Sequence, residues 1–276
     1  MSRVAVVVRD WAHVARRWTA SVLDRTHPDA LADGDGVPIV LLPGIWESWR
    51  YLLPLARRMH ALGHPVHPLP GLGWNGRPLE DSLERARAGL EALGLERPVL
   101  VAHSKGGLIG KILLVDALAA DPDRAPRGLV AVCTPFGGSR LSWRVLTRTP
   151  LGLFAPTGAA IVALAAERAV NSRIVSIASG WDEMIPEGSF LPGAHNITLR
   201  LRGHFRPVAD PGTARLVHEQ VERLAAGWAR GVAGEQREGE PAWVSSPSPS
   251  SPATGCSATG SRSRSSSPRT GPATSG

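Results

Sequence analysis

The segment Pro98 to Lys111, PVLVAHSKGGLIGK, restricts the fold of this chain more than any other stretch. A short apolar run ends at His103, and two glycines after Ser104 and Lys105 lead into a second apolar run. This order predicts a buried strand, a sharp turn and a helix. A serine at such a turn occupies the position of a nucleophile at the end of a strand, where the backbone is strained.

A nucleophile turn brings its strand and helix close together, so small residues must lie two positions before and two positions after the serine. Ala102 and Gly106 are small enough, although glycine is usual at both positions. The pattern also occurs by chance in chains of this size, and an ordinary strand-to-helix turn would explain it. The rest of the chain has to decide between these two interpretations.

Apolar, strand-like segments alternate with helix-like segments along most of the chain. The predicted strands are 37–42, a short one around Val66, 98–103, 128–134, 173–178 and 196–202. The predicted helices are 52–62, 78–93, the run after Ser104, and 210–226. Most of the strands are apolar on both faces, whereas 196–202 alternates as a half-exposed strand near a sheet edge does. We therefore expect an α/β fold with a mostly parallel central sheet and helices on both faces, and an active site at the carboxyl ends of the strands.

Residues 1–36 precede the first clear strand and form a predicted N-terminal helical extension. Apolar residues recur there at helical spacing, at Trp11, Val14, Trp18 and Val22. The favoured interpretation is a helix packed on the core, and the alternative is an interfacial helix that makes a peripheral membrane contact. The predicted α/β domain covers 37–230. From about Glu235 the composition shifts to Ser, Pro, Gly and Thr, which predicts a disordered tail at 231–276.

The composition excludes several classes of function. The formal net charge is +7, but the basic residues are nearly all arginines spread along the chain, which favours a solvated surface over nucleic-acid binding. No apolar stretch approaches the roughly 20 residues that span a bilayer, and the N-terminal run Val4–Val8 is too short for a secretory signal. We therefore expect a cytoplasmic protein. Cys133 lies in an apolar run and is an expected buried thiol, so no disulfide framework is indicated.

A serine nucleophile needs a base beside it and an acid that orients the base, in the chain order serine, acid, histidine. Asp182 lies in the loop after the predicted strand 173–178, where the acid is expected. Glu183 is the nearest competitor and Glu187 a weaker one, and a turn-capping role would also explain Asp182. His204 follows the next predicted strand, 196–202, and is the candidate base.

The other histidines lack such a position. His195 precedes the strand 196–202 and lies at its opposite end, and the side chain of His103 diverges from that of its neighbour Ser104. Six more histidines have no context that supports catalysis: His13, His27, His60, His64, His67 and His218. No cluster of His, Cys or carboxylate residues has metal-ligand spacing, so neither a metal nor another cofactor is expected. Gly71, Gly73 and Gly76 spell a dinucleotide-binding pattern, but the helix after them starts too late for it.

The tetrahedral intermediate of acyl transfer carries a negative oxygen, which backbone N–H groups must already face. One donor is expected from Lys105, directly after the candidate nucleophile, and the other from Ile45, in the loop after the first core strand. Gly44 lets the backbone approach closely there. The ammonium group of Lys105 is a poor base for Ser104, because adjacent side chains diverge at the start of a helix.

These motifs resemble the α/β-hydrolase superfamily, in particular its small bacterial lipases and esterases. The resemblance runs from about Val37 to Ala226 and rests on LLPGIWES at 41–48, LPGLGWN at 69–75, VAHSKGG at 101–107, TPFGGS at 134–139, GWDEMIP at 180–186 and RGHF at 202–205. It implies an α/β-hydrolase fold with nucleophile Ser104, acid Asp182, base His204 and oxyanion donors Ile45 and Lys105. Many relatives have His-Gly in the oxyanion loop, where this chain has Pro43-Gly44.

Residues 139–171 lie between two core strands, where members of this superfamily insert a cap. The segment is apolar enough to cover an acyl-binding pocket, and a connecting helix packed on the sheet is the alternative. Candidate pocket residues are Trp46, Trp74, Phe136 and Phe154. The expected function is hydrolysis of carboxylic esters, in particular lipidic ones, by a Ser-His-Asp triad. The alternatives are acyl transfer to an alcohol, thioester hydrolysis, and a hydrolase-fold binding protein without activity. The sequence does not indicate an oligomeric state.

Overall fold

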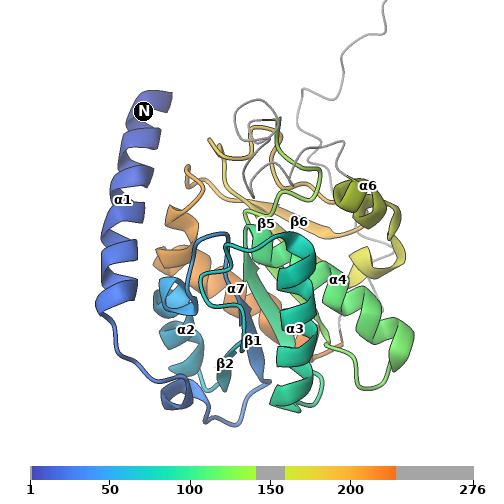
Figure 1. Ribbon diagram of the computed structural model, residues 1–276. Coiled ribbons are helices and arrows are strands. Elements are labelled where there is room, and N and C mark those ends of the chain that lie inside the picture. Colours follow the sequence, from blue (N-terminus) through green and yellow to red (C-terminus); the bar gives the residue numbers. More distant parts are fainter. Residues whose placement is uncertain (1, 141–158, 228–276) are drawn as a thin grey trace, which may run out of the picture. The chain divides into compact units, whose positions relative to one another are not determined.

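A single sheet of six parallel strands lies at the centre of the computed structural model, which describes residues 2–140 and 159–227 (Figure 1). The strands are β1 Ile39–Leu42, β2 Val66–Pro68, β3 Val99–His103, β4 Gly128–Val132, β5 Ile174–Ala178 and β6 His195–Thr198. Their order is β2-β1-β3-β4-β5-β6, and every neighbouring pair is parallel. The predicted α/β fold with a mostly parallel sheet is therefore confirmed.

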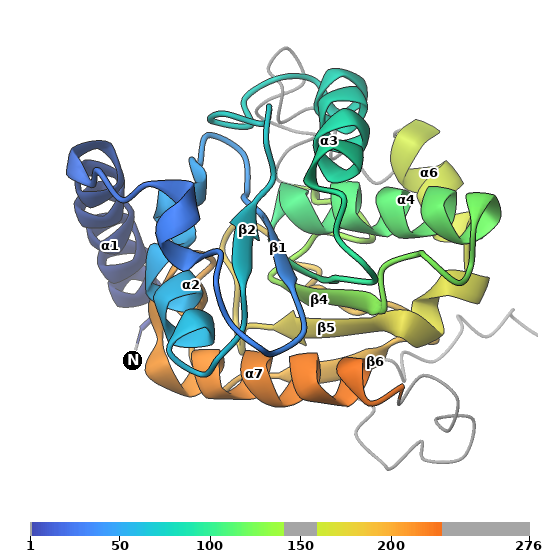
Figure 2. The ribbon, with the colours of Figure 1, turned by 90° about the horizontal axis from the view of Figure 1, so that it is seen from below.

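Helices cover both faces of this sheet, as the apolar strands require. The α-helices are α1 Arg3–Leu23, α2 Leu53–His60, α3 Leu79–Leu93, α4 Lys105–Ala120, α6 Ala159–Ala166 and α7 Pro211–Ala225. Short 3-10 helices lie between them, η1 Pro28–Leu31, η2 Trp49–Leu52, η4 Ala169–Arg173 and η5 Arg206–Ala209. Helices α2 and α7 lie on one face of the sheet, and α3, α4 and α6 lie on the other (Figure 2).

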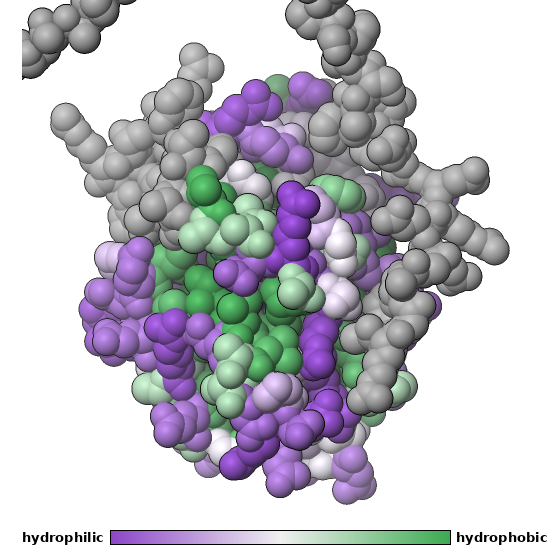
Figure 3. Space-filling view, turned by 90° about the vertical axis from the view of Figure 1, so that its right-hand side faces the viewer, coloured by the Kyte–Doolittle hydropathy of each residue, from purple (hydrophilic) through white to green (hydrophobic). Residues whose placement is uncertain are grey.

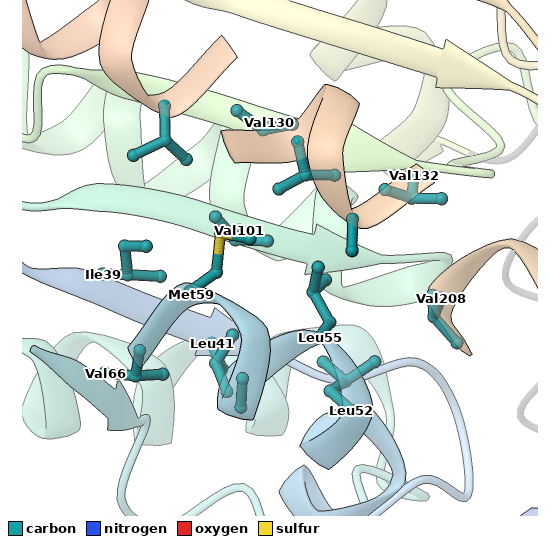
Figure 4. Close-up of a cluster of buried hydrophobic side chains, with 14 of the residues drawn as sticks. Ile39, Leu41, Leu52, Leu55, Met59, Val66, Val101, Val130, Val132 and Val208 are labelled. Carbon is teal, nitrogen blue, oxygen red and sulfur yellow. The ribbon is translucent and has the colours of Figure 1, made fainter. Parts of the chain in front are cut away.

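The strands contribute alternate side chains to two separate hydrophobic clusters. On the α2–α7 face, Leu55 and Met59 of α2 pack against Val101 and Val130 of the sheet (Figure 4). The residues between them in the strands, such as Leu100, pack on the opposite face against α3 and α4. Burial of each such side chain contributes about 1.5–3 kcal/mol, so the sheet is the rigid part of the protein on which the loops are mounted.

Strand β6 is shorter than the sequence predicted. The alternation of apolar residues predicted a strand over 196–202, but β6 covers His195–Thr198 and forms the half-exposed edge of the sheet. Beyond it, the chain still runs alongside the loop after β5. Three backbone hydrogen bonds of 2.8 Å join the two segments: Leu199 N–H to Ala178 O, Gly180 N–H to Leu201 O, and Gly203 N–H to Trp181 O. Beyond Thr198 the segment is therefore held by backbone hydrogen bonds to the loop after β5, without the regular geometry of a strand.

Helix α1 has the position that its apolar spacing predicted, but a different face of it is buried. Its buried residues are Val6, Asp10 and Ser21, whereas Trp11 is 50% exposed and Trp18 is 44% exposed. Polar contacts account for the difference. For example, the Arg17 guanidinium donates to the carbonyl oxygens of Arg50 and Tyr51 at 3.1 and 2.9 Å. The helix therefore packs on the rest of the protein largely through polar side chains.

The predicted tail 231–276, the candidate pocket residue Phe154 and most of the predicted cap 139–171 lie outside the described residues. The described end of the cap segment packs on α4, since Ile161 and Leu164 of α6 are buried in the cluster on that face. The Lys111 ammonium of α4 also donates to Leu164 O at 2.7 Å. The described part of the segment thus packs on the domain, in agreement with the interpretation of 139–171 as a connecting helix; the cap stays a prediction for the rest.

Hydrophobic residues also gather at the surface on the side where α6 lies in Figure 1, surrounded by hydrophilic ones (Figure 3). Val162 of α6 is 56% exposed. Within residues 2–140 and 159–227, no helix combines the length and the apolar composition needed to cross a membrane. All described residues belong to one compact unit, Met1–Gly234.

The close contact between β1 and the start of α4 predicts that Gly106→Ala is strongly destabilising. A Cβ atom at position 106 would overlap the carbonyl oxygen of Leu42, and backbone atoms cannot move aside cheaply. We expect the free energy of unfolding in urea to fall by about 1–3 kcal/mol or more. Gly137→Ala is the matched control, because a Cβ atom there meets nothing within 4 Å. Equal stability of the two variants would contradict this packing.

Candidate active site

Ser104 lies at the sharp turn between β3 and α4, as the sequence predicted. It has φ 52° and ψ −122°, a conformation that costs of order 1–3 kcal/mol in a non-glycine residue. Neighbouring elements hold it there: the N–H of Ser104 donates to Val132 O at 2.9 Å, and the hydroxyl of Thr134 donates to Ser104 O at 3.0 Å. Gly107 makes room for Thr134, whose side chain a Cβ atom at position 107 would overlap.

The structure brings Ser104, His204 and Asp182 together in one line of hydrogen bonds. Ser104 Oγ lies 3.0 Å from His204 Nε2, and His204 Nδ1 lies 2.8 Å from Asp182 Oδ2. Because an ionised carboxylate only accepts hydrogen bonds, Nδ1 carries the imidazole proton, and Nε2 is left to accept the hydroxyl hydrogen of Ser104. All three residues are nearly buried, so water weakens these bonds little.

The carboxylate of Asp182 is held by its own loop as well as by His204. Its Oδ1 accepts the N–H groups of Met184 and Ile185, both at 2.8 Å. Burial by itself would raise the pKa of Asp182, but His204 and these two N–H groups outweigh it, so the pKa lies below its ordinary value. Asp182 is therefore ionised at neutral pH.

The two competing carboxylates point elsewhere. Glu187 forms an ion pair of 2.6 Å with Arg140. Glu183 lies beside the carboxylate of Asp10, and burial together with that neighbour raises the pKa of Glu183 to about 8. The geometry therefore selects Asp182 as the partner of His204.

The loop that carries His204 is anchored by the N-terminal helix, which the sequence did not suggest. The fully buried carboxylate of Asp10 in α1 accepts three consecutive backbone N–H groups. These belong to His204 at 2.8 Å, Phe205 at 3.0 Å and Arg206 at 3.0 Å. Asp10 is a single acidic residue in an otherwise ordinary helical pattern, and no local signal relates it to a loop 194 residues away.

A second buried charge pair lies next to Ser104 in the chain. His103 Nδ1 is 2.8 Å from Glu47 Oε1, and His103 Nε2 is 3.1 Å from the carbonyl oxygen of His204. Both ring nitrogens thus face acceptors, so both carry protons and the ring is an imidazolium. Burial would lower the pKa of His103, but the carboxylate of Glu47 outweighs it and raises that pKa. Glu47 Oε2 also accepts the N–H of Gly44 at 2.7 Å, so this pair joins the loops after β1, β3 and β6.

The side chain of Lys105 points away from Ser104, as expected. Its buried ammonium donates to Asn75 O at 3.0 Å, Arg77 O at 2.6 Å and Ser82 Oγ at 2.8 Å. Burial lowers the pKa of Lys105 to about 8. The three acceptors fix the ammonium at the loop between β2 and α3, so it cannot serve as the base of a serine–lysine pair.

Three of the four candidate pocket residues fall within the described part of the chain. Trp46 and Trp74 are 43% and 42% exposed, and Trp18 of α1 contacts both of them. The indole N–H of Trp18 donates to Trp46 O at 2.8 Å, and its ring lies 5.2 Å from the ring of Trp74. Phe136 is buried in the cluster on the α4 face. The loops after β1 and β2 and helix α1 therefore present a group of three half-exposed indoles.

Cys133 is buried, as predicted, and its sulfur lies within 4.8 Å of a donor atom of Asp182 and of His204. Burial raises the pKa of this thiol well above its ordinary value. A neutral thiol is a weak nucleophile and a weak metal ligand. The two side chains beside it, Asp182 and His204, are hydrogen-bonded to each other. Cys133 therefore packs beside the His204–Asp182 pair without taking the place of Ser104.

Comparisons with known proteins agree with the architecture. No protein-family model matches the sequence, and no curated protein matches it. Lipase B of Aspergillus fumigatus has a similar structure, with a TM-score of 0.51 and 15% identity, over 68% of this chain and 52% of that chain. MGS-MChE2, an α/β hydrolase enzyme from the metagenome of sediments from the lagoon of Mar Chica, Morocco, has a TM-score of 0.51 and 19% identity, over 70% of this chain and 94% of that chain.

The chain therefore has the fold of the α/β-hydrolase superfamily, which confirms the resemblance seen in its motifs. It spans about half the length of the fungal lipase, 52%, and nearly the whole of the metagenomic enzyme, 94%. At such low identity the likeness establishes the fold, and any chemistry has to be argued from the residues at the strand ends.

The raised pKa of Glu183 predicts a pH-dependent loss of stability that Glu183→Gln removes. In the unfolded chain the pKa of this carboxyl has its ordinary value of 4.5, whereas burial and the neighbouring Asp10 raise the pKa in the folded protein to about 8. The unfolded state therefore binds fewer protons in this interval, and stability falls as the pH rises through it. We expect the stability of Glu183→Gln, relative to the parent, to increase between pH 5 and pH 8 in urea titrations. A difference that is the same at both pH values would contradict the prediction.

Proposed function

We propose that this protein is a serine hydrolase that cleaves carboxylic esters through an acyl-enzyme. One observation carries the proposal, the line of hydrogen bonds Ser104–His204–Asp182 at the carboxyl ends of β3, β5 and β6. Each member has the partner that its role requires: a base on the hydroxyl, an acid on the base, and two N–H groups on the acid. An ordinary strand-to-helix turn at Ser104 would need no such partners.

The first half of the reaction forms the acyl-enzyme. His204 Nε2 takes the hydroxyl proton while Ser104 Oγ attacks the ester carbonyl carbon, and Asp182 stabilises the resulting imidazolium. When the tetrahedral intermediate collapses, the bond to the alcohol breaks and His204 gives its proton to the departing alcohol oxygen. In the second half, water loses a proton to His204 and attacks the acyl carbon. Ser104 leaves with that proton, and the acid is released.

The backbone N–H groups of Ile45 and Lys105 are the proposed donors to the oxyanion. Lys105 is the first residue of α4, and the first N–H groups of a helix have no acceptor within it. Ile45 lies in the loop after β1, and no acceptor for its N–H occurs among the described residues. The hydrogen bond that the Gly44 N–H donates to the Glu47 carboxylate holds this loop in place. Preorganised donors of this kind are worth about 10²–10³ in rate each.

We propose lipidic esters as the substrates. The half-exposed indoles of Trp18, Trp46 and Trp74 support this choice, because Trp46 directly follows the proposed oxyanion donor Ile45. Exposed apolar residues continue along α1, at Val4, Val8, Trp11, Val22 and Leu23. Such a surface would favour a peripheral contact with the membrane or droplet that holds an apolar substrate.

Acyl transfer and thioester hydrolysis would use the same triad, so the acceptor and the leaving group have to be measured. Competition between water and added alcohols for the acyl-enzyme separates transfer from hydrolysis. A binding protein without activity would not need an imidazole poised between a hydroxyl and a carboxylate. The complete hydrogen-bonded line therefore favours the enzyme over the binding protein.

An activated serine predicts covalent labelling by a fluorophosphonate probe at Ser104 alone. Ser104→Ala and His204→Ala should both abolish labelling, and Ser104→Ala should reduce kcat/KM on a medium-chain ester by at least about 10⁴-fold. Peptide mapping by mass spectrometry locates the label. Ser172→Ala is the control, since Ser172 is exposed and lies in η4, before β5, whereas Asp182 follows that strand. Labelling that persists in Ser104→Ala, or a folded native protein that never reacts, would refute the mechanism.

The contacts of Asp10 predict that it positions the base without touching the substrate. Asp10→Ala leaves three buried N–H groups of the His204 loop without their acceptor, and displacement of the imidazole should lower kcat by about 10–100-fold with little change in KM. Asp10→Asn retains an acceptor oxygen and should recover most of the rate. Asp29→Ala, an exposed position in η1, is the control. Loss of folding in Asp10→Ala together with full activity in Asp10→Asn would indicate a purely structural role, whereas unchanged kcat in a folded Asp10→Ala would exclude positioning.

A further inference from the structure

Three residues outside the proposed active site form a cluster of metal-ligand atoms. His218 and Glu222 lie four positions apart on α7, which places them on the same face of the helix. His64 lies in the turn between α2 and β2, beside which α7 runs (Figure 2). One ligand atom from each of the three residues lies within 4.8 Å of the others. Because His64 is far from α7 in the sequence, no spacing motif reveals the cluster.

His64 is already oriented as a metal ligand would be. Its Nδ1 is 3.1 Å from the carbonyl oxygen of Val37, and a carbonyl only accepts, so Nδ1 carries a hydrogen. A neutral ring with this tautomer has its lone pair on Nε2. This atom is buried, and it has no hydrogen-bond partner among the described residues. Histidines that bind metals commonly donate their other N–H to a backbone carbonyl in this way.

The carboxylate of Glu222 lies close to that lone pair and is itself an acceptor. Glu222 Oε1 lies 3.2 Å from His64 Nε2, and the ring of His218 lies 5.3 Å from the ring of His64. Two facing acceptors repel unless a positive group lies between them. Ligand atoms that bind one tetrahedral zinc ion at about 2.0–2.1 Å are separated by about 3.3 Å, close to the distance observed.

We propose that His64, His218 and Glu222 bind a divalent transition-metal ion, with Zn²⁺ as the ion that two imidazoles and one carboxylate suit best. His64 is 1% exposed and supplies the buried side of the site. The side chain of Glu222 is 55% exposed, so water reaches the open side and completes the coordination. A proton shared by His64 and Glu222 is the competing explanation, and the experiment below separates the two.

The site lies near the amino ends of the strands, whereas Ser104 lies at their carboxyl ends. Val66 of β2 is in register with Ile39 of β1, and Ile39 is in register with Val99 of β3. His64 precedes this row, whereas Ser104 follows β3 at its carboxyl end. The ion would therefore take no part in catalysis. It would tie α7 to the turn before β2 and, through Val37, to the segment that enters β1.

The test uses the full chain without a polyhistidine tag, freed of metal and titrated with Zn²⁺ by calorimetry and with Co²⁺ by visible absorption. We expect one ion per chain, the intense visible bands of tetrahedral Co²⁺, and a higher melting temperature in Zn²⁺. His218→Ala and Glu222→Gln, both at the accessible side of the site, should weaken binding by at least about 10–100-fold and remove the thermal shift. Glu219→Gln, an exposed neighbour on α7, should bind as the parent does.

Two results would overturn the proposal. In the first, the folded native chain binds neither ion, and the cluster is then a protonated ion pair. In the second, His218→Ala binds Zn²⁺ as the parent does while His204→Ala does not, which places the ion beside Cys133 and Asp182 instead. Labelling of Ser104 by a fluorophosphonate is measured in parallel, and the rate in Glu222→Gln should equal that of the parent with and without Zn²⁺.

Discussion

Charges buried beneath the carboxyl edge of the sheet determine how the candidate active site is assembled. A charged group that leaves water needs close partners to replace its hydration. The imidazolium of His103 has Glu47, the carboxylate of Asp10 has the backbone of the His204 loop, and the ammonium of Lys105 has carbonyls of the β2–α3 loop. In each case the partners belong to different segments. The same contacts that make burial of the charge tolerable also hold the loops in fixed positions relative to one another.

Backbone strain gathers at this edge as well. Trp46, Ser104 and Cys133 all have positive φ values, and they follow β1, β3 and β4, which are neighbours in the sheet. Such conformations persist only where surrounding contacts over-determine them. The two hydrophobic clusters supply a rigid base, and the buried charge pairs fix the loops above it. The rigid sheet and the fixed loops thus hold a hydroxyl, an imidazole and a carboxylate from three separate strand ends in alignment.

Local patterns predicted much of this arrangement and missed what long-range polar contacts decide. The alternation of apolar segments predicted the sheet, and the residues at its strand ends predicted which side chains meet Ser104. The buried face of α1 was not predictable from hydrophobicity, because it is held by polar side chains: Asp10 is buried and Arg17 is partly buried, and both bond to distant backbone groups. The end of β6 was missed because Leu199 and Leu201 keep the strand-like alternation in a segment whose hydrogen bonds are irregular. The pairing of His103 with Glu47 was not predictable from sequence spacing, since the two residues are 56 positions apart and a histidine at the end of a buried strand does not specify its partner.

The hydrogen bonds between Asp10 and the His204 loop also affect when, during synthesis and folding, the candidate active site can assemble. The carboxylate lies 194 residues ahead of His204, so it is synthesised well before its partners. A contact between residues so distant in the sequence carries a large entropic cost of loop closure, and this cost favours its formation after the nearer contacts. An unfinished chain that ends after β5 would contain Ser104 and Asp10 but would still lack the imidazole of His204. The proposed hydrolytic activity would then appear only after α1 and the loop that follows β6 have come together.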